Sequence, residues 1–332
     1  MPTIHVLNQF VWPDAAPTAV YAEQLADELI HRGHDVRLVG STGAYRSLER
    51  PKPAVPVRQL SGFRSTRSNL PGVFIEYASA CRLFARYIRA EVAAKDVVVV
   101  TSAPPPTPWL LRAIRDRGAR AVYWLQDYYP ELVRSLWEYP LWARRAFRKR
   151  WDRALSEWDV VMKIGANLGY GGANAVLRRN WPPFDFSAQD RADHPVAPRT
   201  ALYAGNLGYA HDREILVREC ETLHAEGYRV AVRGDGPGIH QLPDWIACGP
   251  VFADAAALRA GLLEAEVHLV AAHPNFQEAL FPSKLWNSLM AERRVIGTGF
   301  AGIMEQELRE SLASDYRRHR AAAADTVESF LA

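Results

Sequence analysis

The stretch that decides the fold reads EALFPSKLWNSLMA and spans residues 278–291. Apolar runs of strand length stand on both sides of it, which predicts a buried parallel strand, a loop, a helix and the next strand. The helix is expected to open at Pro282 and Ser283, with the Ser283 hydroxyl as its cap. Open α/β sheets bind ligands at the carboxyl ends of their strands, and helix N-termini attract phosphate. The stretch therefore predicts a phosphate-binding corner with Glu278 and Lys284, against the plainer alternative of a capped surface helix.

The same alternation of strands and helices continues outward through the chain. Strands are expected at residues 3–10, 35–40, 55–60, 96–101, 121–125, 160–164, 175–177, 200–204, 228–233, 245–251, 267–272 and 294–297. Besides the helix that opens at Pro282, helices are expected at residues 18–32, 73–93, 139–153, 212–226, 252–265 and 303–312, with one that ends at about residue 118 and a last one running to residue 332. Strands that alternate with helices are typical of an α/β fold with parallel sheets.

Length predicts two domains, because 332 residues exceed what one ordinary core holds. A polar segment with prolines at 184–199 interrupts the alternation and is expected to be a linker. We therefore expect an N-terminal Rossmann-like domain at 1–183 and a C-terminal one at 200–332, with the last helix packing back on the first domain.

The bulk composition excludes several classes of protein. A net charge of +3 is too small for a typical nucleic-acid binder, so no nucleic-acid partner is expected. No apolar run reaches bilayer length, and a strand is expected directly after the first residues, so no signal peptide is expected. Its three scattered cysteines favour reduced, mostly buried thiols in the cytoplasm. The first strand and helix also lack a Gly-x-Gly-x-x-Gly motif between them, which argues against an NAD or FAD enzyme.

A basic segment with aromatic residues lies at 139–153. Trp142, Phe147 and Trp151 are interleaved there with five arginines and one lysine. A helix of this kind can lie on an anionic membrane surface. The alternative is a solvated helix whose aromatic side chains pack on the domain. We favour the alternative, because one such helix binds a membrane only weakly without a second signal.

Seven short motifs occur in a characteristic order along the chain. They are PD at 13–14, RGH at 32–34, QDYYPE at 126–131, NWP at 180–182, GNLG at 205–208, RGDGP at 233–237 and PSK at 282–284. In this order they resemble the GT-B glycosyltransferases of family 4, over nearly the whole chain. The similarity is greatest to the bacterial branch that builds exopolysaccharide and O-antigen repeat units.

The resemblance implies two Rossmann-like domains that face each other across a cleft, the GT-B architecture. It implies that the C-terminal domain binds a nucleotide-sugar donor and that the N-terminal domain binds a saccharide or lipid-linked acceptor. Transfer would retain the anomeric configuration without an essential metal or other cofactor, and the chain has no Asp-x-Asp pair. The protein would be cytoplasmic, peripheral at the inner membrane face, with the membrane surface as a further partner.

The resemblance also assigns roles to individual residues. As catalytic residues it indicates Asp127, Lys284 and Glu278, with Lys284 as the leading cation. Donor-binding positions are Gly205, Asn206, Gly208, His211, Arg213, Gly234, Asp235, Gly236, Pro282, Ser283 and Asn287. Acceptor-binding positions are Asn8, Asp14 and Ala15. Either His211 or Arg213 is expected to be a second cation near the diphosphate.

The chain departs from the family pattern at several of these positions. Asn287 stands where relatives carry a glutamate that grips the donor ribose, so a charge-assisted hydrogen bond is lost. The other family glutamate aligns with Ala279, one residue after Glu278. Asn206 replaces an arginine and Gln126 replaces a histidine. An alternative is therefore a catalytically weakened protein that binds or acts as a scaffold. An epimerase acting on the nucleotide-sugar itself is a third, less favoured reading.

Overall fold

The computed structural model describes residues 2–14, 16–41, 52–63, 70–105, 108–136, 140–208 and 210–331. Its contacts divide the chain into two compact units, each described here by itself. The first unit is Met1–Asn180 with Arg317–Ala332, and the second is Trp181–Tyr316. The expected α/β class is confirmed, because each unit is built on a parallel sheet.

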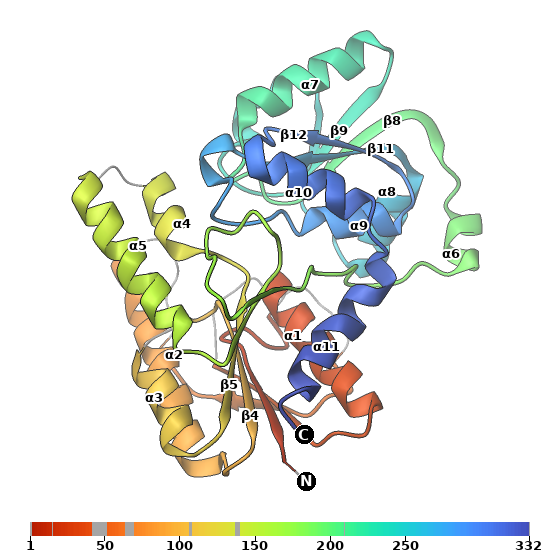
Figure 1. The fold of residues 1–332 in the computed structure, drawn as a ribbon. Coiled ribbons are helices and arrows are strands. Elements are labelled where there is room, and N and C mark those ends of the chain that lie inside the picture. Colours follow the sequence, from red (N-terminus) through yellow and green to blue (C-terminus); the bar gives the residue numbers. More distant parts are fainter. Residues whose placement is uncertain are drawn as a thin grey trace. The chain divides into compact units, whose positions relative to one another are not determined.

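The first unit contains a parallel sheet in the order β3-β2-β1-β4-β5-β6-β7. Its strands are β1 (Ile4–Leu7), β2 (Val36–Ser41), β3 (Val57–Leu60), β4 (Val97–Thr101), β5 (Arg120–Leu125), β6 (Val160–Lys163) and β7 (Ala175–Leu177). Its helices are α1 (Pro17–His31), α2 (Leu70–Glu91), α3 (Pro108–Asp116), α4 (Tyr129–Leu136), α5 (Leu141–Ser156) and α11 (His319–Glu328). Figure 1 shows α2 and α3 on one side of the strands and α1 with α11 on the other. Strand β4 is buried along its whole length, as its run of valines predicts.

The second unit contains a parallel sheet in the order β10-β9-β8-β11-β12. Its strands are β8 (Ala197–Ala204), β9 (Arg229–Arg233), β10 (Ala247–Gly249), β11 (Ala265–Ala271) and β12 (Arg294–Thr298). Its helices are α6 (Ala188–Asp193), α7 (Arg213–Ala225), α8 (Ala255–Glu264), α9 (Lys284–Met290) and α10 (Gly302–Leu312), with short 3-10 turns at η1 (Ile239–Gln241), η2 (Pro274–Phe276) and η3 (Tyr316–Arg318). Apolar side chains fill both faces of the sheet, with Leu216 and Cys220 of α7 in one cluster and Leu263 of α8 in another.

The boundaries differ from those expected at two places. Residues 184–199 contain α6 and the start of β8, and they lie inside the second unit. Helix α6 forms because Ser187 and Asp190 make a reciprocal capping box, a local signal that the polar composition hides. Helix α4 also arises in a segment where no helix was expected.

The last helix belongs to the first unit. Glu328 of α11 accepts hydrogen bonds from Arg32 Nη1 and His34 Nε2, both at 2.8 Å. Arg178 Nε donates to the hydroxyl of Thr326 at 2.6 Å. These charged contacts fix α11 beside the end of α1.

The order of the strands reverses once in each unit. In the first, the chain moves outward from β1 to β3 and then returns to place β4 on the other side of β1. In the second, the chain moves outward from β8 to β10 and then returns to place β11 on the other side of β8. In open parallel sheets ligands bind just outside the carboxyl ends of the strands at such a point. The loops after β1 and β4, and those after β8 and β11, are therefore the positions to search for sites.

Candidate functional site

Lys284 lies at the reversal point of the second unit, at the start of α9. Its Nζ donates a hydrogen bond to the carbonyl oxygen of Asn206 at 3.2 Å and lies 3.0 Å from Nε2 of His211. The same ammonium stands 5.4 Å from the centre of the Tyr203 ring. Desolvation lowers the pKa of Lys284 to about 8, so the ammonium is still mostly charged at neutral pH. The loop after β8 and the helix after β11 thus combine to hold one half-buried cation.

His211 faces Lys284 as a neutral imidazole. Burial, and next the positive charge of Lys284, lower the pKa of His211 to about 3. The expectation that His211 is a second cation is therefore wrong. Burial and the neighbouring ammonium both disfavour the charged imidazolium form. A charged Lys284 can only donate to Nε2, which leaves the ring proton on Nδ1. Nδ1 is buried and makes no hydrogen bond of normal geometry with the described residues, although an interaction with the Gly208 backbone acts on the imidazole.

Two glycines make this arrangement sterically feasible. Gly205 has a φ of +142°, and a Cβ there would lie 2.0 Å from Cε of Lys284. A Cβ on Gly234 would lie 1.9 Å from the carbonyl oxygen of Gly205. Both are distances that real side chains do not reach, so larger residues would displace the Lys284 side chain or separate the two loops.

A pocket of about 480 Å³ opens beside this cluster. Three of the predicted donor-binding residues line it, namely Gly208, His211 and Arg213. The guanidinium of Arg213 contacts Gln241 on η1, another residue of the lining. The pocket is thus bounded by the loop after β8, the start of α7 and the turn after β9.

The turn after β9 contributes mainly backbone. Leu207 N donates to the carbonyl oxygen of Asp235 at 2.7 Å, which joins this turn to the loop after β8. The exposed Asp235 carboxylate accepts from Gly236 N, also at 2.7 Å. The role of both residues in binding a nucleoside stays a prediction.

Helix α9 differs from the expected capped helix. Ser283 occupies the N-cap position in a helical conformation, and its side chain makes no capping hydrogen bond. The expectation that its hydroxyl caps the helix is therefore wrong. Pro282 is buried, and Glu278 is half-buried in the loop that precedes the helix. Because α9 has only 7 residues, we attribute the electropositive character of this corner to Lys284.

Asn287 lies one turn after Lys284 on the same helix. Its side-chain oxygen is buried and has no hydrogen-bond partner in the described ranges. A buried polar atom without a partner costs about 1–3 kcal/mol, so such atoms often await a ligand or water. The predicted donor site therefore contains an unsatisfied acceptor at Asn287.

Asp127 marks the corresponding edge of the first unit, directly after β5. Its backbone N–H donates to Oγ of Ser102 at 3.1 Å, which ties the end of β5 to the end of β4. Its carboxylate forms no hydrogen bond or ion pair with any of the described residues, and desolvation raises its pKa to about 6. A carboxylate with a pKa near neutrality is suited to accept a proton from a hydroxyl group.

The predicted residues of the first loop have different environments. Asn8 is fully buried; it accepts from the hydroxyl of Thr101 at 2.5 Å and donates to the carbonyl oxygen of Phe10. These hydrogen bonds use both the oxygen and the nitrogen of the Asn8 amide and hold the loop in place. Asn8 therefore has a structural role in the loop. Asp14 is buried in the same loop. Ala15 lies outside the described residues.

Two glutamines that the sequence did not single out as site residues accompany Asp127. Both side-chain polar atoms of Gln9 and Nε2 of Gln126 are buried, with no hydrogen-bond partner among the residues described. Gln9 follows β1 and Gln126 follows β5, so both stand at the edge that carries Asp127. Their positions after predicted strands were a usable signal, but an unsatisfied side chain is visible only in the structure.

No three His, Cys, Asp or Glu side chains come together as a metal site would need, within the described ranges. Nor does any described helix have the length and apolar character needed to cross a membrane.

Comparisons with known proteins place this geometry in context. Residues 18–162 match the model of the family described as Glycosyltransferase Family 4. No curated protein sequence matches the chain. The fold is similar to that of WaaG, a glycosyltransferase involved in lipopolysaccharide biosynthesis, with 14% identity, a TM-score of 0.54, and 99% of this chain and 95% of that one covered.

Two further solved structures have the same fold. An α,α-trehalose-phosphate synthase (UDP-forming) from Burkholderia vietnamiensis has 13% identity and a TM-score of 0.54, with 100% of this chain and 96% of that one covered. An α-glucosyltransferase in complex with UDP has 10% identity and a TM-score of 0.52, with 98% and 95% covered. The chain therefore has the GT-B fold of glycosyltransferases, and its N-terminal half is similar to glycosyltransferase family 4.

Proposed function

We propose that this chain is a retaining glycosyltransferase that moves a hexose from a nucleotide-diphosphate sugar to a saccharide acceptor. The contact between Lys284, His211 and the Gly205–Asn206 turn carries the proposal. Breaking the bond between the sugar and the diphosphate leaves negative charge on the departing phosphate, which a cation and N–H donors must stabilise. Lys284 supplies the cation, and the buried Nδ1–H of His211 supplies a neutral donor beside it. This stabilisation is the basis for proposing transfer without a metal ion.

The donor nucleotide would lie against the pocket beside His211. Asn287 offers its unsatisfied oxygen to a hydroxyl group, and a ribose hydroxyl fits this role. UDP is the first nucleotide to test, because the similar α-glucosyltransferase fold was solved with UDP.

The acceptor would bind at the edge of the first unit that carries Asp127. A sugar hydroxyl needs a partner for its proton, and an unpartnered carboxylate with a pKa of about 6 can take it. The unsatisfied amides of Gln9 and Gln126 would hydrogen-bond further hydroxyls of the same saccharide. A lipid-linked saccharide in the synthesis of cell-surface polysaccharide is the acceptor class that the family resemblance favours.

Membrane association through α5 forms part of the same proposal. Leu141 is 59% exposed and Trp142 is 75% exposed, and Arg145 and Lys149 are exposed further along the helix. Apolar side chains beside cations suit the interface of an anionic membrane. By contrast Trp151 contacts Tyr129, with ring centres 5.3 Å apart, so this part of the helix packs on its own unit.

The test begins with a thermal-shift screen of nucleoside diphosphates and their sugars in the presence of EDTA. We expect one nucleotide to raise the melting temperature by mass action, and its sugar to be transferred to a saccharide acceptor with the anomeric configuration unchanged by NMR. Stabilisation that requires a divalent cation would contradict metal independence. An inverted product would contradict retention.

A binding or scaffold protein is the second candidate, and Asn287 is the observation that favours it. Without the family glutamate, the donor site loses a charge-assisted hydrogen bond to the ribose. A protein that binds a nucleotide-sugar but neither transfers nor hydrolyses its sugar would support this candidate. If Asn287→Glu then restored turnover, the loss would be assigned to this position.

A further inference from the structure

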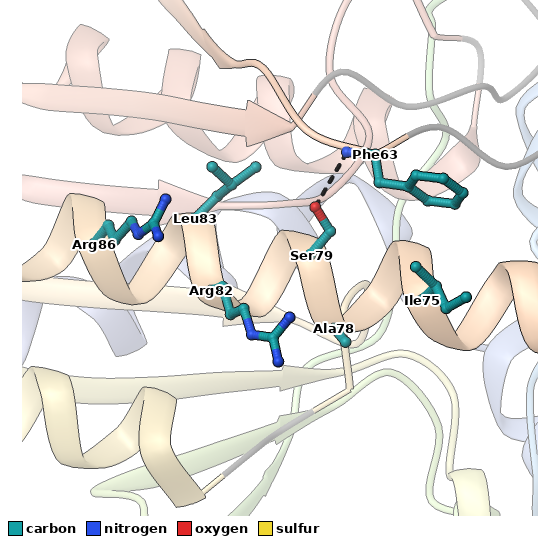
Figure 2. Close-up of a pocket in the computed structure, with 7 residues that line it drawn as sticks. All are labelled: Phe63, Ile75, Ala78, Ser79, Arg82, Leu83 and Arg86. Carbon is teal, nitrogen blue, oxygen red and sulfur yellow. Dashed lines mark hydrogen bonds between the residues drawn. The ribbon is translucent and has the colours of Figure 1, made fainter.

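A groove runs along the outer surface of α2 in the first unit. Figure 2 shows its lining, which comes from α2 and from Phe63 in the segment after β3. The backbone N–H of Phe63 donates to Oγ of Ser79 at 3.1 Å, which fixes the segment against the helix. The groove has a volume of about 460 Å³, enough for a short length of a single apolar chain.

One end of the groove is apolar and exposed. Phe63 is 48% exposed and Ile75 is 54% exposed, although both belong to residue types that usually avoid water. Leu83 adds a half-buried apolar wall, and Ala78 forms a small-residue floor. Adjacent exposed apolar side chains in a concave surface are typical of ligand-binding grooves.

The other end of the groove is basic. Arg82 and Arg86 are four residues apart on α2, so their side chains lie on the same face of the helix, and both are exposed. Neither forms an ion pair with any carboxylate in the described part of the chain. Elsewhere in the same unit Arg37 and Arg58 share the carboxylate of Glu91, at 3.3 and 3.0 Å. Two uncompensated arginines at this spacing repel each other, and a bound anion would relieve the repulsion.

We propose that this groove binds one lipid phosphate, with the phosphate between Arg82 and Arg86 and the apolar chain along Leu83, Ile75 and Phe63. Arginine guanidinium groups bind phosphate oxygens through paired hydrogen bonds, which suits a phosphate ester. An alkyl or isoprenoid chain suits a groove with apolar side chains along one end and a small-residue floor. An acidic peptide would match the arginines but would leave the exposed Phe63 and Ile75 without an apolar partner.

The groove is distinct from the proposed transfer site. Helix α2 leads from β3 to β4, so it begins at the carboxyl edge of the sheet and runs away from it. Arg86 lies eleven residues after Ile75, which places the basic end about 16 Å further from that edge at ~1.5 Å per residue. A phosphate bound there is therefore far from Asp127, and the lipid is a bound anchor or effector, separate from the reacting acceptor.

Dodecyl phosphate, used below its micelle concentration, is the probe for the experiment. Calorimetric titration of the full chain is expected to give saturable binding with one site. The Arg82→Ala/Arg86→Ala double variant is expected to bind at least tenfold more weakly, and Phe63→Ser/Ile75→Ser is expected to weaken binding to a similar degree. Arg89→Ala, an exposed arginine of the same helix outside the groove, is the matched control and should bind like the wild type.

The competing outcomes are distinguishable. Equal affinity for inorganic phosphate would reduce the site to an anion site, and equal affinity for dodecyl maltoside would reduce it to an apolar groove. Binding to anionic phospholipid vesicles without binding to monomeric dodecyl phosphate would replace the single lipid by a membrane surface. Binding of a poly-glutamate peptide alone would point to an acidic protein partner, and each of these results would overturn the proposal. The nucleotide-induced thermal shift should be unchanged in the double variant, so the test is independent of the proposed transferase activity.

Discussion

Nζ of Lys284 lies 3.0 Å from Nε2 of His211, although the two residues are 73 positions apart in the chain. The pair joins the loop after β8 to the helix after β11, across the point where the strand order reverses. An ammonium that donates to a neutral imidazole and to the carbonyl oxygen of Asn206 has one further N–H bond to offer to a ligand. The pair therefore presents donors from both loops to an incoming anion.

Replacing Lys284 with alanine is expected to abolish transfer and leave the fold intact. The ammonium is the cation that would stabilise the departing diphosphate, and loss of such a group typically slows the reaction about 10²–10³-fold. Steady-state kinetics with the donor found in the thermal-shift screen would measure the change. Circular dichroism and the melting temperature would verify the fold.

Lys163→Ala is the matched control for this variant. Lys163 ends β6 in the first unit, where its ammonium donates to the nearby carbonyl oxygen of Ala166. We expect wild-type activity from it. A wild-type rate for Lys284→Ala would refute the assignment of the donor site.

Donor binding is expected to weaken as the pH rises through about 8. Desolvation lowers the pKa of Lys284 to about 8 in the free protein, and a bound diphosphate would raise it again by favouring the charged form. Binding should therefore take up a proton near pH 9 and weaken there by up to about tenfold per pH unit. Calorimetry of nucleotide binding in buffers of different ionisation enthalpy would detect this proton. A flat affinity between pH 7 and 10 would exclude contact with Lys284.

The folding stability of the free protein should depend on pH in the opposite direction to donor binding. A lysine whose pKa is lowered on folding destabilises the folded state while it is charged. This penalty is full below pH 8 and is relieved as the pH rises from about 8 towards the unfolded value of 10.5. Ligand binding and folding stability thus move in opposite directions over the same range.

The location of the donor corner could be predicted from local patterns. A strand followed by PSK and a helix placed Lys284 at a carboxyl edge, and GNLG placed a tight turn at another. The state of His211 could not be predicted, because it depends on burial and on a cation that only the folded chain brings near. The Ser283 cap was predicted wrongly for a related reason: residue type favours a cap, but backbone conformation decides whether the hydroxyl can reach.

The sequence also could not predict which polar side chains lack a hydrogen-bond partner. Asn8 and Gln9 are adjacent polar residues after the same strand, and the resemblance singled out Asn8. In the structure Asn8 is hydrogen-bonded to Thr101, whereas the amide of Gln9 has no partner in the described ranges. Adjacent residues of a strand end point to opposite sides, so which one is free depends on the packing around both.

Asp127→Asn is expected to abolish transfer while stabilising the protein. The carboxylate is the proposed partner of the acceptor hydroxyl, and its amide replacement cannot take up a proton. Its raised pKa of about 6 means that ionisation costs stability as the pH rises from 3.8 to about 6. Removing the charge should therefore raise the unfolding free energy at pH 7, by up to about 3 kcal/mol at ~1.4 kcal/mol per pKa unit.

Donor binding and acceptor binding separate the outcomes for this variant. Asp127→Asn should retain the nucleotide-induced thermal shift, because Asp127 belongs to the first unit. In the wild type the low-pH limb of kcat/KM for the acceptor should have its midpoint near pH 6. A fully active Asp127→Asn variant, or one that is less stable than the wild type at pH 7, would contradict the assignment.

Asp96→Ala is expected to destabilise the first unit without changing the sites. Asp96 precedes β4, at the edge of the sheet opposite to Asp127, and its carboxylate accepts from Thr3 N at 2.9 Å, Ala93 N at 2.7 Å and Nε2 of His5 at 3.1 Å. Burial alone would raise the pKa of Asp96, but these hydrogen bonds outweigh it and lower the pKa. Losing all three hydrogen bonds should cost about 3 kcal/mol, measured by urea unfolding. The stabilisation is present above the ordinary aspartate pKa and lost as the pH falls through the lowered value, so the stabilities of wild type and variant should converge in acid.

Asp116→Ala, which removes an exposed carboxylate 3.9 Å from Arg112, should cost less than about 1 kcal/mol and serves as the control. A loss in Asp96→Ala no larger than in this control would show that the buried hydrogen bonds contribute little to stability.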